Sequence, residues 1–245
     1  MVRLPGGTFV MGDESPWSYP DDHEGPTREV HVDAMILDAH AVSNERFATF
    51  VDDTAHVTDA EQHGCSFVFG GFLPHDFPET RGVAAAPWWR EVPGADWRHP
   101  EGPQSDLAAR DDHPVVHVSA RDAAAFATWA GKRLPSEDEW EYAARAGSST
   151  TFPWGDELEP DGEHLANVWQ GTFPGSNTAA DGYSGTCPVT AFPASAFGTH
   201  NMIGNVWEWT ASTWGTERVL KGGSYLCHAS YCRRYRPAAR SRASL

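Results

Sequence analysis

The stretch from Lys221 to Arg240 contains two cysteines, Cys227 and Cys232, which are five residues apart. In an extended strand their side chains would point to opposite faces, with α-carbons roughly 16 Å apart. In a helix they would lie well off a common face. The two sulfur atoms therefore meet only if the chain turns through residues 228–230. A Gly-Gly pair precedes the cysteines and a proline follows them, and both residue types interrupt regular structure.

If the chain turns there, the cysteine pair has three possible chemistries. A disulfide needs α-carbons within about 7 Å of each other. Two thiolates suit a soft metal ion such as Cu(I), and a redox-active pair would have one attacking and one resolving thiol. Otherwise the residues are buried thiols that pack as small hydrophobic side chains. The spacing alone leaves these alternatives open, whereas Cys65 and Cys187 lie far apart and are expected to be unpaired.

Length and charge limit the class of protein. A chain of 245 residues suits one domain, residues 1–245, with a full core. The net charge of -16 argues against nucleic acid as a partner, because phosphate contacts need clustered Lys and Arg. We see neither a leader with a charged start and apolar core nor an apolar run near the length of a membrane span. We therefore expect a cytoplasmic monomer that has no membrane partner.

The residue types indicate a fold dominated by loops. The chain has 23 Gly, 18 Pro and 11 Trp, and few long helical periods are visible. Helices are expected after the N-cap residues Ser43, Ser119 and Ser136, the last two with an acidic residue three positions on. Strands are expected at residues 4–11, 30–37 and 115–118. Residues 55–112 are expected to be irregular.

Two residue pairs have both a functional and a structural interpretation. Trp88 and Trp89 are adjacent and could line a groove for a peptide, or they could belong to the core. His113 and His117 have the spacing of a helical metal pair, but Pro114 and the strand-like valines between them argue against a helix. We interpret both histidines as structural.

Two stretches, residues 167–183 and 201–208, are rich in side-chain oxygens and exposed backbone oxygens. Hard cations such as Ca²⁺ take six to eight oxygen ligands, many of them carbonyls in loops. Neither stretch matches an EF-hand loop. Calcium binding and plain loop packing through Asx turns therefore remain alternatives at this point.

Nine segments in order along the chain closely resemble the bacterial type of formylglycine-generating enzyme, the sulfatase-modifying factor 1 family. They are GGTFVMG, DAHAVSNERFATFV, WRHPEGP, HPVVHVS, WAGKRLPSEDEWEYAAR, FPWGDE, ANVWQGTFP, GNVWEWT and KGGSYLCHASYCRRYRPAAR. The resemblance covers nearly the whole chain, and residues 227–232 with their flanks single out the enzymes within a wider family. It implies an α+β fold with little regular secondary structure, a variant of the C-type-lectin-like fold.

The resemblance also implies an activity. The family oxidises one cysteine of a sulfatase, within a Cys-x-Pro-x-Arg motif, to Cα-formylglycine with O2. Its two active-site cysteines match Cys227 and Cys232, which would hold Cu(I) and accept the substrate thiolate as a third ligand. Ser224 and Tyr231 are candidates for ordering oxygen or substrate beside the copper, and Trp207 for a wall of the site. Trp88 and Trp89 are candidates for contacts with the peptide.

The family's calcium positions can be carried over in the same way. The first set is Asn167, Val168, Asp181 and Tyr183, and the second is Asn201, Gly204, Val206 and Glu208. Val168, Tyr183, Gly204 and Val206 would each contribute a backbone carbonyl. Structural Ca²⁺ therefore joins Cu(I) as an expected cofactor.

Three rival interpretations need separating from the copper oxidase. A non-catalytic lectin-like binding module would share the fold but would not need both thiols. An iron-dependent sulfoxide synthase also shares the fold, but its histidine-rich iron site needs an added helical domain that the sequence lacks. A metal-free redox pair at Cys227 and Cys232 would survive treatment with a strong Cu(I) chelator.

Overall fold

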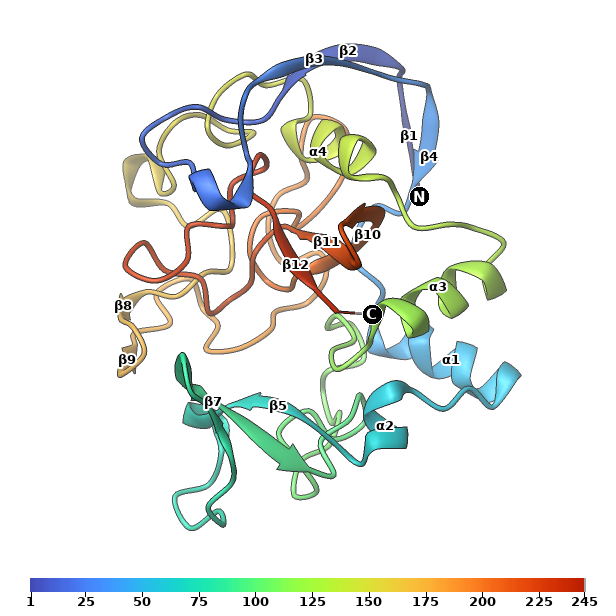
Figure 1. Cartoon of the computed structure of the whole chain (residues 1–245), viewed down its shortest axis with the longest axis vertical. Coiled ribbons are helices and arrows are strands. Elements are labelled where there is room, and N and C mark those ends of the chain that lie inside the picture. The colour runs from blue at the N-terminus through green and yellow to red at the C-terminus, as the bar shows by residue number, and fades with distance from the viewer. Residues whose placement is uncertain (245) are drawn as a thin grey trace. The chain divides into compact units, whose positions relative to one another are not determined.

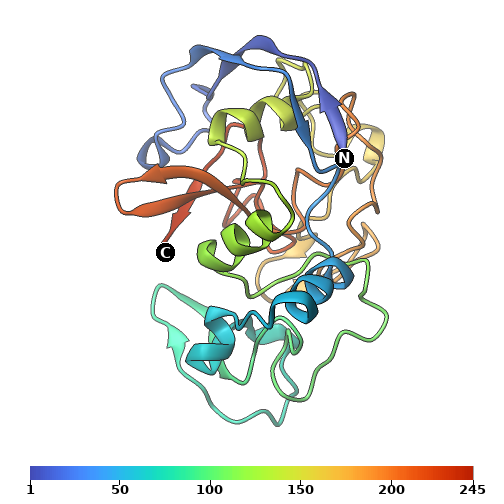
Figure 2. The same ribbon diagram turned by 90° about the vertical axis from the view of Figure 1, so that its right-hand side faces the viewer.

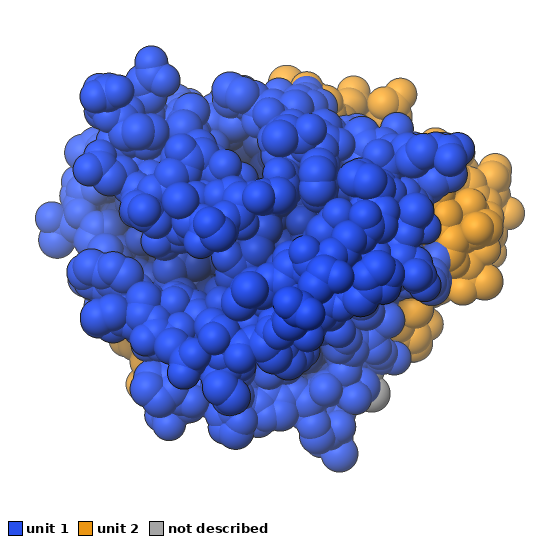
Figure 3. Space-filling model, turned by 90° about the horizontal axis from the view of Figure 1, so that it is seen from above, with its two compact units in different colours: residues 1–41, 133–245 blue, residues 42–132 orange. Residues whose placement is uncertain are grey.

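The computed structural model describes residues 1–244 and divides into two compact units (Figure 3). Unit 1 consists of residues 1–41 and 133–244, and unit 2 of residues 42–132. The longest helix has 11 residues and the longest strand has 8. This confirms the expected α+β fold with little regular secondary structure. None of the helices among the described residues combines the length and apolar character needed to cross a membrane.

The elements of each unit are short and joined by long loops (Figures 1 and 2). Unit 1 contains β1 (Val2–Leu4), β2 (Gly7–Met11), η1 (Pro20–Asp22), β3 (Arg28–Val32), β4 (Met35–Leu37), α4 (Glu137–Arg145), η3 (Pro160–Gly162), β8 (Gly171–Thr172), β9 (Ser176–Asn177), β10 (Glu208–Trp214), β11 (Glu217–Lys221) and β12 (Ser241–Ala243). Unit 2 contains α1 (Asn44–Thr54), α2 (Asp59–His63), β5 (Cys65–Phe69), η2 (Gly70–Phe72), β6 (Gly82–Val83), β7 (Ala86–Pro93) and α3 (Ala120–Trp129).

The three predicted helix starts are correct. The side-chain oxygens of Ser43, Ser119 and Ser136 accept backbone N–H groups at the starts of α1, α3 and α4, respectively. At α3 and α4 the acidic residue three positions on completes a capping box. Within unit 1, α4 packs against β2, β3, β10 and β11, and Figure 1 shows it beside the β2–β3 hairpin.

The two strands predicted near the N-terminus are each broken in two. Pro5 and Gly6 separate β1 from β2, since proline has no N–H for a ladder hydrogen bond. A side chain at Gly6 would meet the backbone nitrogen of Ala34 at 2.8 Å, so the chain crosses itself closely there. As a result β1 pairs with β4 and β2 pairs with β3, in two separate antiparallel sheets.

Two further predictions for unit 2 are wrong. The region 55–112 is only partly irregular, because it contains α2 and a three-stranded sheet in the order β5-β7-β6. Residues 115–118 do not form a strand, although Pro114 bridges to Ser43. His117 has a φ of +57°, which ends any extended run. Val115 and Val118 instead pack against the core around Phe47, Phe50, Trp97 and Phe126.

His117 is structural, as predicted, and carries a testable pH dependence. Its Nε2 lies 2.8 Å from the Pro100 carbonyl oxygen, which can only accept, and its Nδ1 lies 2.8 Å from the Ser66 hydroxyl. The neutral ring fits both partners, and burial lowers the pKa of His117 below its usual 6.5. As pH falls below 6.5, the unfolded chain therefore gains a proton that the folded chain does not, and stability is lost.

We expect His117→Asn to flatten this acid dependence. The variant should be less stable at neutral pH, because it loses one of two buried hydrogen bonds, but its melting temperature should fall less on acidification. The measurement is Tm by circular dichroism at about pH 7.5 and about pH 5.5, on either side of the histidine range. A Tm difference between the two pH values that matches wild type would contradict the prediction.

Candidate active site

The chain turns between the two cysteines of unit 1, as their spacing requires if the thiols are to meet. The His228 carbonyl accepts the backbone N–H groups of Tyr231 at 2.9 Å and Cys232 at 2.7 Å. The turn brings the Sγ atoms of Cys227 and Cys232 to 2.8 Å from each other. A disulfide bond is about 2.05 Å long, and both residues are free thiols. Both are also buried, with exposed fractions of 2% and 5%.

Backbone hydrogen bonds from two sides hold Cys227. Its N–H donates to the Ser224 carbonyl at 2.9 Å, and its carbonyl accepts the Trp169 N–H at 3.1 Å. The Ser224 hydroxyl oxygen accepts the N–H of Leu226 at 3.3 Å. Ser224 thus lies in the same tight turn as Cys227, where its hydroxyl group also contacts the thiol.

The pKa values of the two thiols are shifted in opposite directions. The hydrogen bond from Cys227 is the largest cause that lowers the pKa of Cys232 to about 7, and the nearby Arg234 adds to it. Burial, together with this neighbouring sulfur, raises the pKa of Cys227 well above its usual range. The opposite shifts favour a proton on Cys227 and place negative charge, where the pair carries one, on Cys232.

The donor set of this pair fits a soft monovalent metal. Two sulfur atoms lie side by side, and thiolates are the ligands that Cu(I) prefers. Within residues 1–244, no group of three or more His, Cys, Asp and Glu side chains is placed to share a metal ion. Copper bound here would therefore rely on Cys227 and Cys232 alone among the protein's side chains of these types.

Aromatic side chains surround the cysteine pair. Phe152, Ile203 and Tyr235 belong to the same buried cluster as the two cysteines, and Trp207 packs against that cluster. Tyr231 is 39% exposed, and its ring stacks on Phe173 with the ring centres 4.6 Å apart. Trp207 thus packs against the cluster that contains the cysteine pair, whereas the ring of Tyr231 stacks on Phe173, and the role of Trp207 as a wall of the site stays a prediction.

The predicted pair Trp88 and Trp89 lies on β7 of unit 2, which is paired with β5. Consecutive strand residues point to opposite faces, so the two rings do not share one surface of the sheet. Both side chains are half-buried. Their contact with a peptide stays a prediction.

The first candidate calcium set has oxygens that converge. The carbonyl of Val168 and Oδ2 of Asp181 lie 2.5 Å and 3.2 Å from one atom, Nε2 of Gln170. Oδ1 of Asn167 is buried without a hydrogen-bond partner. Burial raises the pKa of Asp181, although hydrogen bonds from Tyr183 and Gln170 to its carboxylate act in the opposite direction. Tyr183 continues this loop, and its N–H donates to Oδ1 of Asp181 at 2.9 Å.

The second candidate set shares two of these features. Oδ1 of Asn201 is also buried without a partner, while the amide nitrogen donates to the Pro188 carbonyl at 2.9 Å. Burial raises the pKa of the Glu208 carboxyl to about 7, and Oε2 of Glu208 accepts a hydrogen bond from Nε1 of Trp140 at 2.9 Å. Val206 lies between Gly204 and Glu208 and would offer its carbonyl. Buried, under-satisfied oxygens are what a bound Ca²⁺ would complete.

The two candidate calcium loops contact each other and the cysteine turn. The Asn167 carbonyl accepts the Asn205 N–H at 2.8 Å, and a side chain at Gly204 would meet that carbonyl at 2.2 Å. The Asn205 carbonyl in turn accepts the Tyr225 N–H at 3.0 Å. Backbone hydrogen bonds therefore connect the oxygen-rich loops to the segment that carries Cys227.

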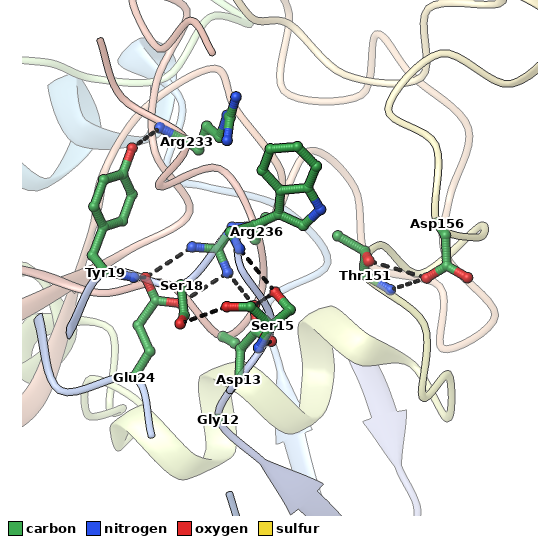
Figure 4. A network of polar contacts seen from close by, with 12 residues as sticks. Gly12, Asp13, Ser15, Ser18, Tyr19, Glu24, Thr151, Asp156, Arg233 and Arg236 are labelled. Atoms are coloured by element: carbon green, nitrogen blue, oxygen red, sulfur yellow. Dashed lines mark hydrogen bonds and ion pairs between the residues drawn. The ribbon is translucent and has the colours of Figure 1, made fainter. Parts of the chain in front are cut away.

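The acidic loop at residues 13–24 belongs to the site, and the sequence interpretation missed it. In Figure 4 its side chains surround the basic stretch that follows Cys232: Tyr19 contacts Arg233, and Asp13 and Glu24 contact Arg236. The opposite charges of the two stretches were the available signal. Charge complementarity alone does not identify which acidic loop of a strongly acidic chain meets the basic run.

The chain matches the sulfatase-modifying factor enzyme 1-like domain over residues 1–244, which spans both units. It is 52% identical to the formylglycine-generating enzyme of Thermomonospora curvata, covering 98% of this chain and 87% of that protein. It is 51% identical to the formylglycine-generating enzyme of Bos taurus, covering 98% and 70%. The solved structure of PvdO from Pseudomonas aeruginosa is 25% identical, with a TM-score of 0.65 over 99% of this chain and 87% of that one.

These findings place the chain in the class of enzymes with a sulfatase-modifying factor enzyme 1-like domain. The chain belongs to the formylglycine-generating enzyme family. The expectation drawn from the nine sequence segments is thereby confirmed.

Proposed function

We propose that the protein oxidises a cysteine in a sulfatase Cys-x-Pro-x-Arg motif to Cα-formylglycine, using O2 and Cu(I) held by Cys227 and Cys232. The observation that carries the proposal is the pair of buried thiols with their sulfur atoms 2.8 Å apart, and the lowered pKa of Cys232 supports it. Membership of the formylglycine-generating enzyme family supplies the reaction and the sulfatase substrate. When bound, Cu(I) supplies the activation of O2.

The protein's own residues would hold the metal ion, shield the two sulfur atoms from water and orient oxygen or substrate. Cys232 would offer the more readily ionised sulfur, and Cys227 would release its proton to solvent if both sulfurs acted as ligands. The cluster of Phe152, Ile203 and Tyr235 keeps bulk water from the sulfurs, and Trp207 covers it on one side. The Ser224 hydroxyl lies in the cysteine turn, where it can donate a hydrogen bond to oxygen or to substrate.

The assay must contain a reductant, because oxidation of the cysteine alone does not supply all the electrons that O2 takes up. Conversion of the –CH2–SH group to –CHO releases the sulfur as sulfide and supplies only part of the electrons that full reduction of O2 takes. A thiol reductant supplies the rest. The expected products are therefore the peptide aldehyde, sulfide, water and the oxidised reductant.

The test is mass spectrometry of a synthetic Cys-x-Pro-x-Arg peptide incubated with the protein, Cu(I), a thiol reductant and O2. We expect conversion of the cysteine to an aldehyde, and we expect a strong Cu(I) chelator to abolish it. Conversion that is unchanged by the chelator would favour the metal-free thiol mechanism. No conversion by folded, copper-loaded protein would favour the lectin-like binding module.

We further propose that Ca²⁺ occupies the two loops and stabilises the fold. The first site would use Asn167, Val168, Asp181 and Tyr183, and the second would use Asn201, Gly204, Val206 and Glu208. The unpartnered buried oxygens of Asn167 and Asn201 support both assignments. The convergence of the Val168 carbonyl and the Asp181 carboxylate on one point supports the first.

Asp181→Ala should lower thermal stability more in calcium than in chelator. Without a cation, burial disfavours the charged form of Asp181, so its removal costs little. With saturating calcium, the loss of binding should lower Tm on the order of 5 °C. The measurement is Tm of variant and wild type in calcium and in chelator, with the exposed Asp156→Ala as control. An equal loss of Tm in both conditions would rule out a calcium role for Asp181.

The remaining expectations concern partners and location. The partner is a sulfatase chain that carries the motif, with O2 as the second substrate. A monomeric state, a cytoplasmic location and the absence of membrane and nucleic-acid partners stay predictions, as does the one-domain description of residues 1–245.

A further inference from the structure

The residues that directly follow Cys232 are held by a loop more than two hundred positions earlier in the chain. Arg233 lies 214 residues from Tyr19, and Arg234 lies 212 residues from Asp22. Both partners belong to unit 1, in or next to the short helix η1. No sequence motif of the cysteine turn includes them.

Tyr19 forms a hydrogen bond with the peptide group that joins Cys232 to Arg233. Its hydroxyl oxygen accepts the backbone N–H of Arg233 at 2.9 Å (Figure 4). That N–H belongs to the same rigid plane as the α-carbon of Cys232. On the other side, the Cys232 N–H donates to the His228 carbonyl at 2.7 Å. Cys232 is therefore held from both of its peptide groups, one by its own turn and one by Tyr19.

Asp22 forms an ion pair with the next residue along the chain, Arg234. Its Oδ2 lies 2.5 Å from Nε of Arg234, and the two side chains are only 14% and 27% exposed. The guanidinium group also lies 4.3 Å above the centre of the Tyr19 ring. A partly buried charged hydrogen bond with a stacked guanidinium restricts the Arg234 side chain far more than an exposed ion pair would.

Arg236 anchors the loop that carries these two residues. Its guanidinium group donates two hydrogen bonds to Glu24, both 2.8 Å, and one to Asp13 at 2.5 Å. The side chains of Arg236 and Glu24 are 3% and 0% exposed. The Asp13 N–H also donates to the Glu24 carbonyl at 3.1 Å, which closes the loop on itself. Tyr19 and Asp22 are thus presented from a closed, anchored loop.

We propose that Tyr19 and Asp22 are positioning residues that hold Cys232 opposite Cys227. The inference deepens the proposed function, because the cysteine pair is the site that it concerns. Neither residue is shown bonded to a sulfur atom; they act through the Arg233 amide and the Arg234 side chain. Removing either contact leaves the turn at His228 intact but lets the Cys232 peptide rotate, so the two sulfurs spend less time within reach of each other.

The test measures how closely the two thiols are held, without copper and without turnover. Wild type, Tyr19→Phe and Asp22→Asn are equilibrated in glutathione redox buffers, in which the two thiols and glutathione disulfide give the protein disulfide and two glutathione thiols. After alkylation and tryptic digestion, residues 222–233 form one peptide that contains both cysteines of the pair and neither Cys65 nor Cys187. Mass spectrometry of that peptide gives the disulfide fraction, and hence the equilibrium constant.

We expect the equilibrium constant to fall about tenfold in each variant, the usual effect of losing one hydrogen bond of this strength. Glu14→Gln is the matched control, because Glu14 lies in the same acidic loop but bonds to Thr27, outside the contacts with the cysteine segment. It should leave the constant unchanged, and Asp22→Glu should restore part of the loss seen in Asp22→Asn. Tyr19→Phe keeps the ring beneath Arg234 and serves as the decisive variant if Asp22→Asn fails to fold.

Equilibrium constants equal to wild type in folded Tyr19→Phe and Asp22→Asn would overturn the proposal. A similar loss in Glu14→Gln would also overturn it, because the effect would then belong to the loop as a whole. If wild type fails to convert the sulfatase peptide while the variants still show the tenfold difference, the proposed function falls and the positioning role stands.

Discussion

Cys232→Ser is expected to lower peptide oxidation by at least about a thousandfold, since it removes one of the two side chains that act together as a unit. Cys227→Ser should be nearly as damaging. A serine hydroxyl is a hard donor that neither ionises near neutral pH nor binds Cu(I) as a thiolate does. The sulfurs lie 2.8 Å apart, so each variant leaves a single thiol where the site offers two.

The measurement is the initial rate of aldehyde formation on the synthetic peptide, together with Cu(I) binding by competition with a chromophoric chelator. Cys65→Ser is the control, because it makes the same substitution in unit 2, where Sγ of Cys65 contacts Glu91. That variant should keep its activity. Full activity in either Cys227→Ser or Cys232→Ser would exclude a site that needs both thiolates.

Lys221→Met is expected to lower the free energy of unfolding by about 3–5 kcal/mol, the range seen when one partner of a buried ion pair is removed. The Lys221 side chain is fully buried, and its Nζ lies 3.1 Å from Oε2 of Glu141 and 3.3 Å from the Ala238 carbonyl. Methionine fills similar space but leaves the Glu141 carboxylate with one cation fewer. Lys221 also directly precedes Gly222 and Gly223, so its loss should loosen the start of the cysteine segment.

Chemical denaturation monitored by tryptophan fluorescence measures this loss. Arg28→Ala is the control, because Arg28 forms an exposed ion pair with Asp138 in the same unit. Exposed pairs contribute roughly 0–1 kcal/mol, so this variant should remain close to wild type. A loss below about 1 kcal/mol in Lys221→Met would show that the buried pair only offsets its own desolvation.

Much of the local structure was predictable because its causes lie within a few residues. Ser119 and Ser136 cap their helices with acidic partners three positions on, so a short window contains the whole signal. The turn at His228 follows from the spacing of Cys227 and Cys232 if their sulfurs are to meet. The predicted strand at 115–118 failed because His117 has a positive φ, and the ring of this residue bonds to Ser66 and Pro100, which lie outside any local window.

The sequence by itself determined the helix starts, the loop-rich character, the family and the two thiols of the site. Only the tertiary structure decided how those thiols are held. Tyr19, Asp22 and Glu24 reach the residues after Cys232 across more than two hundred positions, in a chain whose many carboxylates leave the choice of partner open. Local propensity and spacing report interactions over a few residues, whereas a hydrogen bond to the Arg233 amide exists only after the acidic loop folds against it.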